Sequence, residues 1–253
     1  MTQAKWKVIC DDVTEQMRAF TRPFATPLTT PTPETIRLTG TGSYVDIEGR
    51  RLLLTCEHVA RYKPVHNRFA GSDDVFEHQG PWREDQHPID AATAPVSGAA
   101  WAAASHQAGA VPAAAFAARH YVAQPEELLF FRGYAGENAA YGFGVHAANG
   151  SGYCTQEVKA SGDSQIFEMF WEPLQTQFTA ETSAEAKASM GFNDAQGFSG
   201  SLVWNTRYLE TAGAGRKWSP ADAQVTGLLR RWDTGTKTLL VWRVEHLRAW
   251  LGI

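Results

Sequence analysis

Short apolar segments separated by turn residues run through most of the chain and constrain its fold more than any other feature. The segment 35–56, TIRLTGTGSYVDIEGRRLLLTC, alternates apolar and polar residues, turns at Glu48–Gly49 and resumes as an apolar run. This pattern is typical of a β-hairpin whose second strand is buried. Further strand-like segments follow between turn signals: ELLFFRGYAG, AAYGFGVHAA, SQIFEMFWEP, GSLVWN, QVTGLLRRW and TLLVWRV. Short strands without alternating helices predict a mainly antiparallel β architecture.

The other regions lack this pattern. Residues 1–36 are interpreted as an N-terminal arm with a short helix, because Val13, Met17 and Phe20 form one apolar stripe. The prolines that follow predict that regular structure stops there. These prolines are Pro23, Pro27, Pro31 and Pro33. Residues 106–119 belong to an alanine-rich connector broken by glycine and proline. The final segment, RVEHLRAWLGI, has the apolar spacing of a short helix.

Composition limits the function classes. The 253 residues, 43% of them hydrophobic and 20% charged, suffice for one large domain or two small ones. With 23 basic and 27 acidic side chains and no basic patch, we expect no nucleic-acid partner. The chain has no secretory signal pattern and no apolar run of about 20 residues, so we expect no membrane partner.

Cysteine usage bears on the compartment. Cys10, Cys56 and Cys154 are an odd number and form no C-x-x-C pair. They argue against a disulfide scaffold and a structural zinc site, and they fit a reducing environment. We therefore expect a soluble, cytoplasmic protein.

The stretch NDAQGFSGSLVWN, residues 193–205, places Ser199 in a glycine-flanked turn before an apolar strand. Glycine and serine are ordinary turn residues, so chemistry requires a general base and a group that orients it. His58, in LLLTCEHVA, directly follows an apolar strand and is the best placed of the eight histidines. Asp90, in HPIDAATAPV, is a carboxylate entering an apolar run, which is costly unless it is paired. His58 and Asp90 are therefore the candidate partners of Ser199.

These residues and their contexts resemble the trypsin-like (chymotrypsin-fold) serine proteases. GTGSYVDIEGRRLLLTCEHVA is similar to the strand and turn that carry the family's catalytic histidine, IDAA to the segment around its aspartate, and QGFSGSLVW to its nucleophile loop. PEELLFFRGYAG resembles the segment with which bacterial heat-shock-type members open their second barrel. The resemblance covers residues 37–253.

The resemblance implies two packed antiparallel six-stranded β-barrels with the active site between them. The first barrel would span residues 37–105 and carry His58 and Asp90. The second would span residues 120–253 and carry Ser199 and the C-terminal helix. The implied protein is a bacterial cytosolic serine endopeptidase that acts on protein or peptide substrates through an acyl-enzyme, without metal or organic cofactor. Without a recognisable propeptide, we expect control by a regulatory protein partner or by the arm, and a stress or defence role is a hypothesis.

The resemblance also assigns roles. Ser199 Oγ would attack the scissile carbonyl, His58 would take the proton and pass it to the leaving amine, and Asp90 would orient His58. The backbone N–H groups of Gly197 and Ser199 would form the oxyanion hole. Ser201 is a rival nucleophile, but its position after the serine favours a structural role.

Several positions depart from the family pattern. Phe198 stands where secreted members have the aspartate that pairs with a newly cut N-terminus, so that activation switch is absent. Cys56 stands at a usual alanine and has no cysteine nearby. In the substrate pocket, Asn193 replaces the aspartate of trypsin-type specificity. Asp194 next to it, or Arg230 from the GLLRRW segment, would then set the preference, and Arg230 would favour acidic substrates.

Other interpretations remain open. An α/β-hydrolase would use the order serine, acid, histidine, which Ser199, Asp222 or Asp233, and His246 satisfy, although too few residues follow Ser199 for that fold. The same scaffold could also serve as a catalytically silent binding module. A β-rich protein without this site would require the three motifs to be coincidental.

A zinc site is a further alternative. It would use His66, His78 and His87, whose spacing matches no known metal geometry. We therefore expect no metal.

Overall fold

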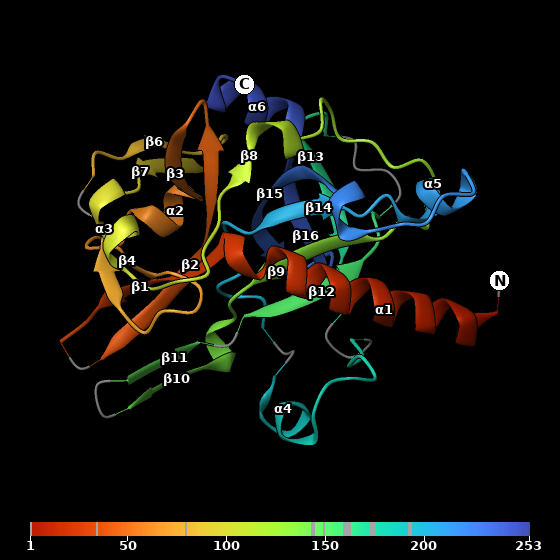
Figure 1. Cartoon of the computed structure of the whole chain (residues 1–253), viewed down its shortest axis with the longest axis horizontal. Helices are drawn as coiled ribbons and strands as arrows, with labels where there is room; N and C mark the ends of the chain where they lie inside the picture. The colour runs from red at the N-terminus through yellow and green to blue at the C-terminus, as the bar shows by residue number, and fades with distance from the viewer. Residues whose placement is uncertain are drawn as a thin grey trace.

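A computed structural model describes the chain apart from residues 1, 34, 79, 143, 144, 149, 159–162, 173–175, 192 and 193. In the described part the molecule is mainly β, with two large sheets packed side by side and a small hairpin projecting from them (Figure 1). The predicted fold class, mainly β with a C-terminal helix, is confirmed.

The first sheet has eight strands among the described residues, in the order β5-β4-β1-β2-β3-β7-β6, with β8 pairing parallel to β2. The strands are β1 (Ala25–Pro31), β2 (Ile36–Ile47), β3 (Arg50–Thr55), β4 (His66–Arg68), β5 (Val75–Glu77), β6 (Arg83–Asp85), β7 (Ala91–Pro95) and β8 (Val111–Pro112). The hairpin predicted for residues 35–56 is β2 and β3, joined at Glu48–Gly49, where both residues have positive φ. Six strands were expected, and the larger number follows from short strands outside the sequence pattern.

One of these additional strands corrects an expectation about the arm. β1 runs antiparallel to β2 from Ala25, opposite Ser43, to Pro31, opposite Ile36. On its other side it pairs with β4 only through Thr29. Because few ladder hydrogen bonds are needed on that side, the missing N–H groups of its prolines are tolerated. The prediction that prolines keep this segment irregular is therefore wrong.

The second sheet has six strands in the order β12-β9-β14-β15-β16-β13. They are β9 (Leu129–Gly133), β12 (Ser151–Thr155), β13 (Ile166–Phe170), β14 (Leu202–Asn205), β15 (Gln224–Asp233) and β16 (Thr238–Arg243). A bridge between Glu157 and Met169 joins the continuation of β12 to β13, so the edges meet and the sheet closes into a barrel. The small hairpin consists of β10 (Ala139–Gly142) and β11 (Val145–Ala148).

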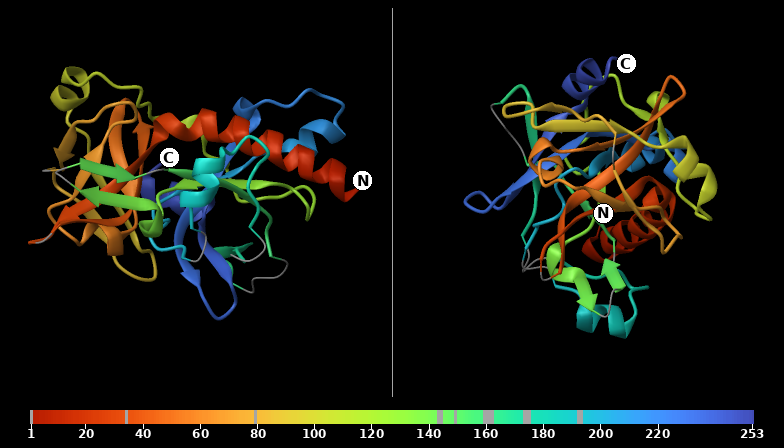
Figure 2. Two further views of the ribbon diagram at one scale, coloured as in Figure 1. Left: turned by 90° about the horizontal axis from the view of Figure 1, so that it is seen from below. Right: turned by 90° about the vertical axis from the view of Figure 1, so that its left-hand side faces the viewer.

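Helices cover the edges of this framework. The longest, α1 (Gln3–Thr21), has 19 residues instead of the short helix expected, and it lies along the second barrel, where it contacts β9 and β12 (Figure 2). Val13 and Met17 on its inner face are fully buried. The predicted C-terminal helix is α6 (Val244–Leu251), with Val244 and Leu247 buried.

Shorter helical segments complete the described part. They are α2 (Glu57–Ala60), α3 (Gly98–Ala103), α4 (Ala184–Ser189), α5 (Tyr208–Gly213) and the single turns η1 (Arg22–Phe24), η2 (Ala113–Ala115), η3 (Gly136–Asn138) and η5 (Pro220–Asp222). In the part of the chain that the structure describes, no helix has the length and apolar character required to cross a bilayer.

A shared apolar core holds the two sheets together. Leu28 and Tyr44 of the first sheet belong to the same buried cluster as Trp204 and Leu228 of the second. Burial of apolar surface is the main stabilising contribution to folding, so this cluster fixes the two sheets relative to each other. The boundaries proposed at residues 37, 106 and 120 stay a prediction.

Candidate active site

Asp90 occupies a conformation that few residue types adopt. It lies directly before β7, with φ of 51°, and its N–H donates to Gln86 O at 3.1 Å. Aspartate and asparagine tolerate this left-handed region better than most residues. The turn directs the carboxylate away from the strand and toward α2, the short helix that carries His58.

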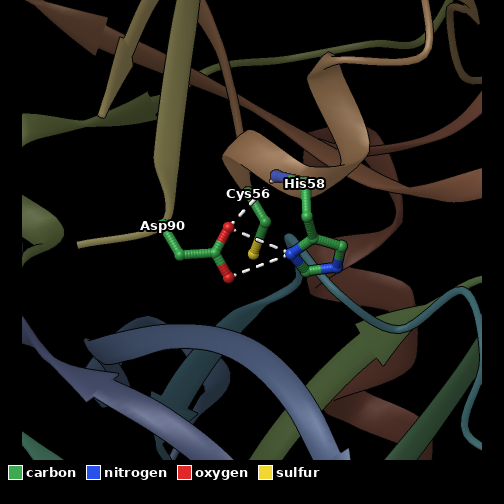
Figure 3. Close-up of side chains that lie close together, drawn as sticks. All are labelled: Cys56, His58 and Asp90. Atoms are coloured by element: carbon green, nitrogen blue, oxygen red, sulfur yellow. Dashed lines mark hydrogen bonds and ion pairs between the residues drawn. The ribbon is translucent and has the colours of Figure 1, made fainter. Parts of the chain in front are cut away.

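His58 and Asp90 form a close pair (Figure 3). The carboxylate accepts the backbone N–H of His58 at 3.1 Å, and its oxygens lie 3.0 and 2.9 Å from the ring Nδ1. The side chain of Asp90 is 12% exposed and that of His58 is 33% exposed. This arrangement holds the ring through Nδ1, so Nε2 carries the acid–base chemistry available to a substrate.

Arg230 supplies a second partner to the same carboxylate. Its Nε lies 3.7 Å from Asp90 Oδ2, and its side chain is 11% exposed. A register shift between Leu229 and Arg231 interrupts the pairing of β15 with β16 and changes the direction of the intervening side chain. The guanidinium therefore lies beside Asp90, because a sheltered carboxylate attracts an opposite charge. The role proposed for Arg230 in the substrate pocket stays a prediction.

These neighbours determine the ionisation of Asp90. Burial by itself raises the pKa of its carboxyl. The hydrogen bonds to His58, with the charges of His58 and Arg230, act in the opposite direction and outweigh it, so the pKa lies below its ordinary value of 3.8. Asp90 is thus an anion at neutral pH, as required of a group that stabilises an imidazolium.

Cys56 lies beneath this pair. Its sulfur is fully buried and within hydrogen-bond reach of Leu229 O at 3.4 Å. Burial first, and then the negative charge of Asp90, raise the pKa of this thiol well above its ordinary value. Cys56 is consequently a neutral thiol without access to substrate, and it is not a nucleophile.

Among the described residues, the group with metal-ligand spacing is Cys56, His58 and Asp90, whose ligand atoms lie within 4.8 Å of one another. The group does not fit a cation well. Its thiol is held protonated, Nδ1 is already bonded to the carboxylate, and Arg230 places a positive charge beside it. The zinc alternative at His66, His78 and His87 is not such a group in the described part of the chain.

Ser199 lies in a turn shaped by glycines. Gly197 has φ of 102° and Gly200 has φ of 92°, both in the region that side chains rarely adopt. A Cβ on Gly197 would also collide with Tyr134 O, and one on Gly200 with Thr41 O. Both glycines are therefore required by backbone geometry, and Ser199 between them is held partly exposed.

The first sheet holds this turn beside the helix of His58. Thr41 donates its N–H to Ser199 O at 2.9 Å and its hydroxyl to Gly197 O at 2.7 Å. Gly40 lies between α2 and the turn that carries Ser199. A Cβ there would lie 2.6 Å from Val59 Cγ2 on one side and 3.0 Å from Ser199 O on the other. In the described residues no hydrogen bond joins Ser199 Oγ to His58. Such bonds are commonly long without substrate.

The backbone around Ser199 presents two unpaired donors. In the part of the chain that the structure describes, the N–H groups of Gly197 and Ser199 have no acceptor, whereas the intervening Phe198 N–H bonds to Ala195 O at 3.2 Å. Two N–H groups on either side of one residue can bind a single oxyanion. The turn therefore offers, next to its serine, two donors of the kind that an oxyanion hole requires.

Phe198 anchors the turn in the second barrel. It is 1% exposed, and its ring centroid lies 5.2 Å from those of Phe131 and Tyr153 and 5.5 Å from that of Trp171. Aromatic pairs at these separations add stability beyond their buried area. Phe198 is thus an apolar anchor at the position where the resemblance indicated that the activation switch is absent.

The pocket residues are described in part. The carboxylate of Asp194 accepts the N–H of Gln196 at 2.8 Å, so it forms a hydrogen bond within its own loop. The N–H of Asp194 donates to Glu137 Oε1 at 3.1 Å. The role proposed for Asn193 falls on a residue outside the described part of the chain. Sequence reasoning missed Thr41 and Glu137, and the glycines flanking Thr41 in TGTGS were the signal for a close approach of backbones.

Two rival sites are excluded. Ser201 is fully buried and cannot meet a substrate. The α/β-hydrolase arrangement is wrong because the sheets are built mainly of antiparallel pairs and its acids are used elsewhere. Asp222 binds Ser219, Asp233 binds Gly235 and Thr236, and His246 contacts Ser164 O.

Comparison with known proteins agrees with this fold. The chain superposes on the Rv3671c protease from M. tuberculosis in its active form with a TM-score of 0.53 and 15% identity, over 95% of this chain and 85% of the other. It superposes on the serine protease domain of the Sesbania mosaic virus polyprotein with a TM-score of 0.50 and 13% identity, over 90% and 92%. No family model and no curated protein sequence matches. At these identities the likeness establishes the fold, which is that of the trypsin-like serine proteases.

Proposed function

We propose that this protein, whose fold is that of the trypsin-like serine proteases, is a serine endopeptidase that uses Ser199, His58 and Asp90. The observation that carries the proposal is the position of the His58–Asp90 pair. It lies across Gly40 from a serine turn whose two flanking N–H groups have no acceptor among the described residues. A sheltered carboxylate on Nδ1, with no partner of Nε2 among the described residues, is the arrangement that a general base requires.

The reaction follows from this geometry. His58 Nε2 takes the proton of Ser199 Oγ as the oxygen bonds to the substrate carbonyl carbon. The carbonyl oxygen becomes an anion and accepts the N–H groups of Gly197 and Ser199, each contributing about 3 kcal/mol to transition-state stabilisation. His58 then protonates the leaving amine, and an ester remains on Ser199. Water, deprotonated by His58, hydrolyses the ester and regenerates the serine.

Digestion of a peptide library by the wild-type protein tests this proposal, with Ser199→Ala and His58→Ala as controls. We expect cleavage by the wild type and loss of at least about 1000-fold of the rate in each variant. The same experiment defines the cleavage preference. Equal cleavage by Ser199→Ala and wild type would assign the activity to another site or to a contaminant.

One observation favours a second candidate, a binding module on the same scaffold. Ser199 Oγ and His58 are not hydrogen-bonded in the described residues. If Ser199 Oγ never forms a hydrogen bond to His58, the protein binds peptides without cutting them. Binding of library peptides that remain intact in both wild type and Ser199→Ala would support this alternative.

We further propose that the enzyme is cytoplasmic and controlled by a protein partner. Cys10, Cys56 and Cys154 are all free thiols, which suits a reducing compartment. Control by the arm is tested by deleting residues 1–21. A deletion of residues 1–36 would also remove β1 from the first sheet. Unchanged peptidase activity of the folded shorter chain would assign control to the partner.

A stress or defence role is the setting that we propose for such a regulated protease. The reason is that this chain lacks the activation switch of secreted members, so its activity requires another form of control. Expression of the wild type and of Ser199→Ala in the source cell under stress would test it, and equal survival would contradict it.

A further inference from the structure

A cavity of about 780 Å³ lies where α1, the segment after β4 and the end of β9 meet. Four arginines line it: Arg18 of α1, Arg22 directly after α1, Arg68 of β4 and Arg132 of β9. The acidic side chains that line it are Glu15 and Asp73. The cavity therefore carries a formal excess of two positive charges, in a chain whose net charge is −4.

Two of the four arginines lack a paired carboxylate among the described residues. Arg18 is paired with Glu15 at 2.8 Å, but Arg22 and Arg132 have no carboxylate partner in the described part of the chain. Arg132 donates to Gly150 O at 3.3 Å, and its buried Nε has no acceptor among the described residues. Burial first, and then the charges of Arg18 and Arg22, lower the pKa of Arg132 despite the opposing contribution of Tyr134.

The helix alone does not explain this cluster. Arginines at a helix C-terminus interact favourably with the helix dipole, which accounts for Arg18 and Arg22. Arg68 and Arg132, however, come from strands of two different sheets. Like charges gathered from three elements repel one another, and the buried Nε of Arg132 has no acceptor among the described residues, so an anion bound in this space would be stabilised.

We propose that this cavity binds a small molecule that carries phosphate groups. The planar guanidinium group presents parallel donors that match phosphate oxygens, and several arginines around one group give both affinity and orientation. The volume is in the range of sites for small molecules and exceeds the need of a single phosphate. Pro27, Phe69 and Met190, which also line the cavity, provide an apolar wall for the rest of the ligand. Because the arginines converge on one space and do not follow a surface stripe, a small molecule fits better than an acidic peptide.

Tyr134 connects the cavity to the serine turn, the segment 197–200 that carries Ser199. Tyr134 lines the cavity, its N–H donates to Thr41 Oγ1 at 3.0 Å, and that hydroxyl donates to Gly197 O at 2.7 Å. A Cβ on Gly197 would meet Tyr134 O, so the two backbones are in direct contact. A ligand that orders Tyr134 would thus order the N–H groups beside Ser199. This connection rests on the proposed function, whereas the binding site does not.

Isothermal titration of the full chain tests the site, with inorganic phosphate, pyrophosphate and ATP as probes at constant ionic strength. The Ser199→Ala variant is titrated in parallel, so that the result does not depend on activity. We expect saturable binding of pyrophosphate or ATP with one site per chain. Arg132→Gln and the exposed Arg22→Gln should each weaken binding by about tenfold or more, as expected for loss of one charge-assisted contact. The matched control is Arg119→Gln, an exposed arginine outside the cavity, which should leave binding unchanged.

Several results would overturn the site. They are the absence of saturable binding for all three probes, equal binding in Arg22→Gln and the wild type, or binding of a hexaglutamate peptide without binding of the phosphates. The last result would assign the cavity to an acidic protein segment.

The connection to the turn is tested separately by the rate at which a fluorophosphonate labels Ser199. We expect saturating ligand to accelerate labelling severalfold in the wild type and not in Arg22→Gln. Ligand binding with an unchanged labelling rate would disprove the connection and leave the site standing. Ligand binding by a protein that never labels would disprove the protease function and leave the site standing.

Discussion

The guanidinium of Arg230 lies 3.7 Å, from Nε to Oδ2, from the carboxylate of Asp90 that binds His58 Nδ1. Asp90 therefore has a positive group on each of two sides when His58 is protonated. The charge of Arg230 is among the factors that hold the pKa of Asp90 below its ordinary value. This relationship makes Arg230 a positioning residue for the proposed triad and leads to the first prediction.

Replacement of Arg230 by glutamine should destabilise the protein by about 1 kcal/mol, because Asp90 loses one positive neighbour and keeps its hydrogen bonds to His58. It should also raise the pKa of Asp90, so the pH of half-unfolding in acid should move upward. Urea unfolding at several pH values measures both effects. The control is Arg231→Gln, the exposed neighbour, and equal effects of the two variants would contradict the role of Arg230.

Asp90→Asn should keep the backbone turn, since asparagine also tolerates positive φ, and should lower kcat by about 10⁴-fold, the scale known for the same change in other triads. It also removes a pH-dependent contribution to stability. The pKa of Asp90 is lower in the folded than in the unfolded state, so its charge stabilises the fold above pH 3.8. That stabilisation is lost as the pH falls through the lower, folded-state pKa.

The difference in free energy of unfolding between wild type and Asp90→Asn should therefore be constant near neutral pH and shrink as the pH falls below 3.8 toward the lower, folded-state pKa. Urea titrations of both proteins provide the measurement. A difference that is constant or grows toward acid would show that folding does not lower the pKa of Asp90.

Cys56 should be inert in the native protein. Burial raises the pKa of its thiol, so iodoacetamide at mildly alkaline pH should modify it only after unfolding. Cys56→Ala should retain peptidase activity and lose about 1 kcal/mol of stability from the small cavity. Mass spectrometry of the alkylated peptides checks the first point. Inactivation that correlates with native modification of Cys56 would instead indicate a cysteine nucleophile.

Phe198 should be required for a competent serine turn. Phe198→Ala removes a side chain packed among Phe131, Tyr153 and Trp171, and should cost about 3–5 kcal/mol. Phe198→Leu should lose less, because leucine fills part of the space. In the proteins that remain folded, kcat should fall more than KM rises, since the oxyanion donors act mainly in the transition state. An unchanged kcat in Phe198→Ala would show that the aromatic anchor does not hold the turn.

The local parts of this account were predictable from the sequence, because they depend on short-range patterns. The β2–β3 hairpin, α6 and the glycine requirements around Ser199 follow from alternation, apolar spacing and turn chemistry. The pairing of β1 was not predictable, because prolines are tolerated there only through the sparse contact with β4. The direction of Arg230 was equally hidden, since it depends on a register shift against β16. The arginine cavity was not predictable either, because its lining residues come from segments far apart in the chain.

The most direct test of the central claim is the site of covalent modification by a fluorophosphonate. The native protein is treated with the reagent, digested and mapped by mass spectrometry, with Ser199→Ala and Asp90→Asn treated in parallel. We predict one adduct per chain, located on Ser199, absent in Ser199→Ala and formed far more slowly in Asp90→Asn. An adduct on Ser201 or another residue, or no adduct in a folded wild-type protein with and without pyrophosphate, would contradict the claim that Ser199 is an activated nucleophile.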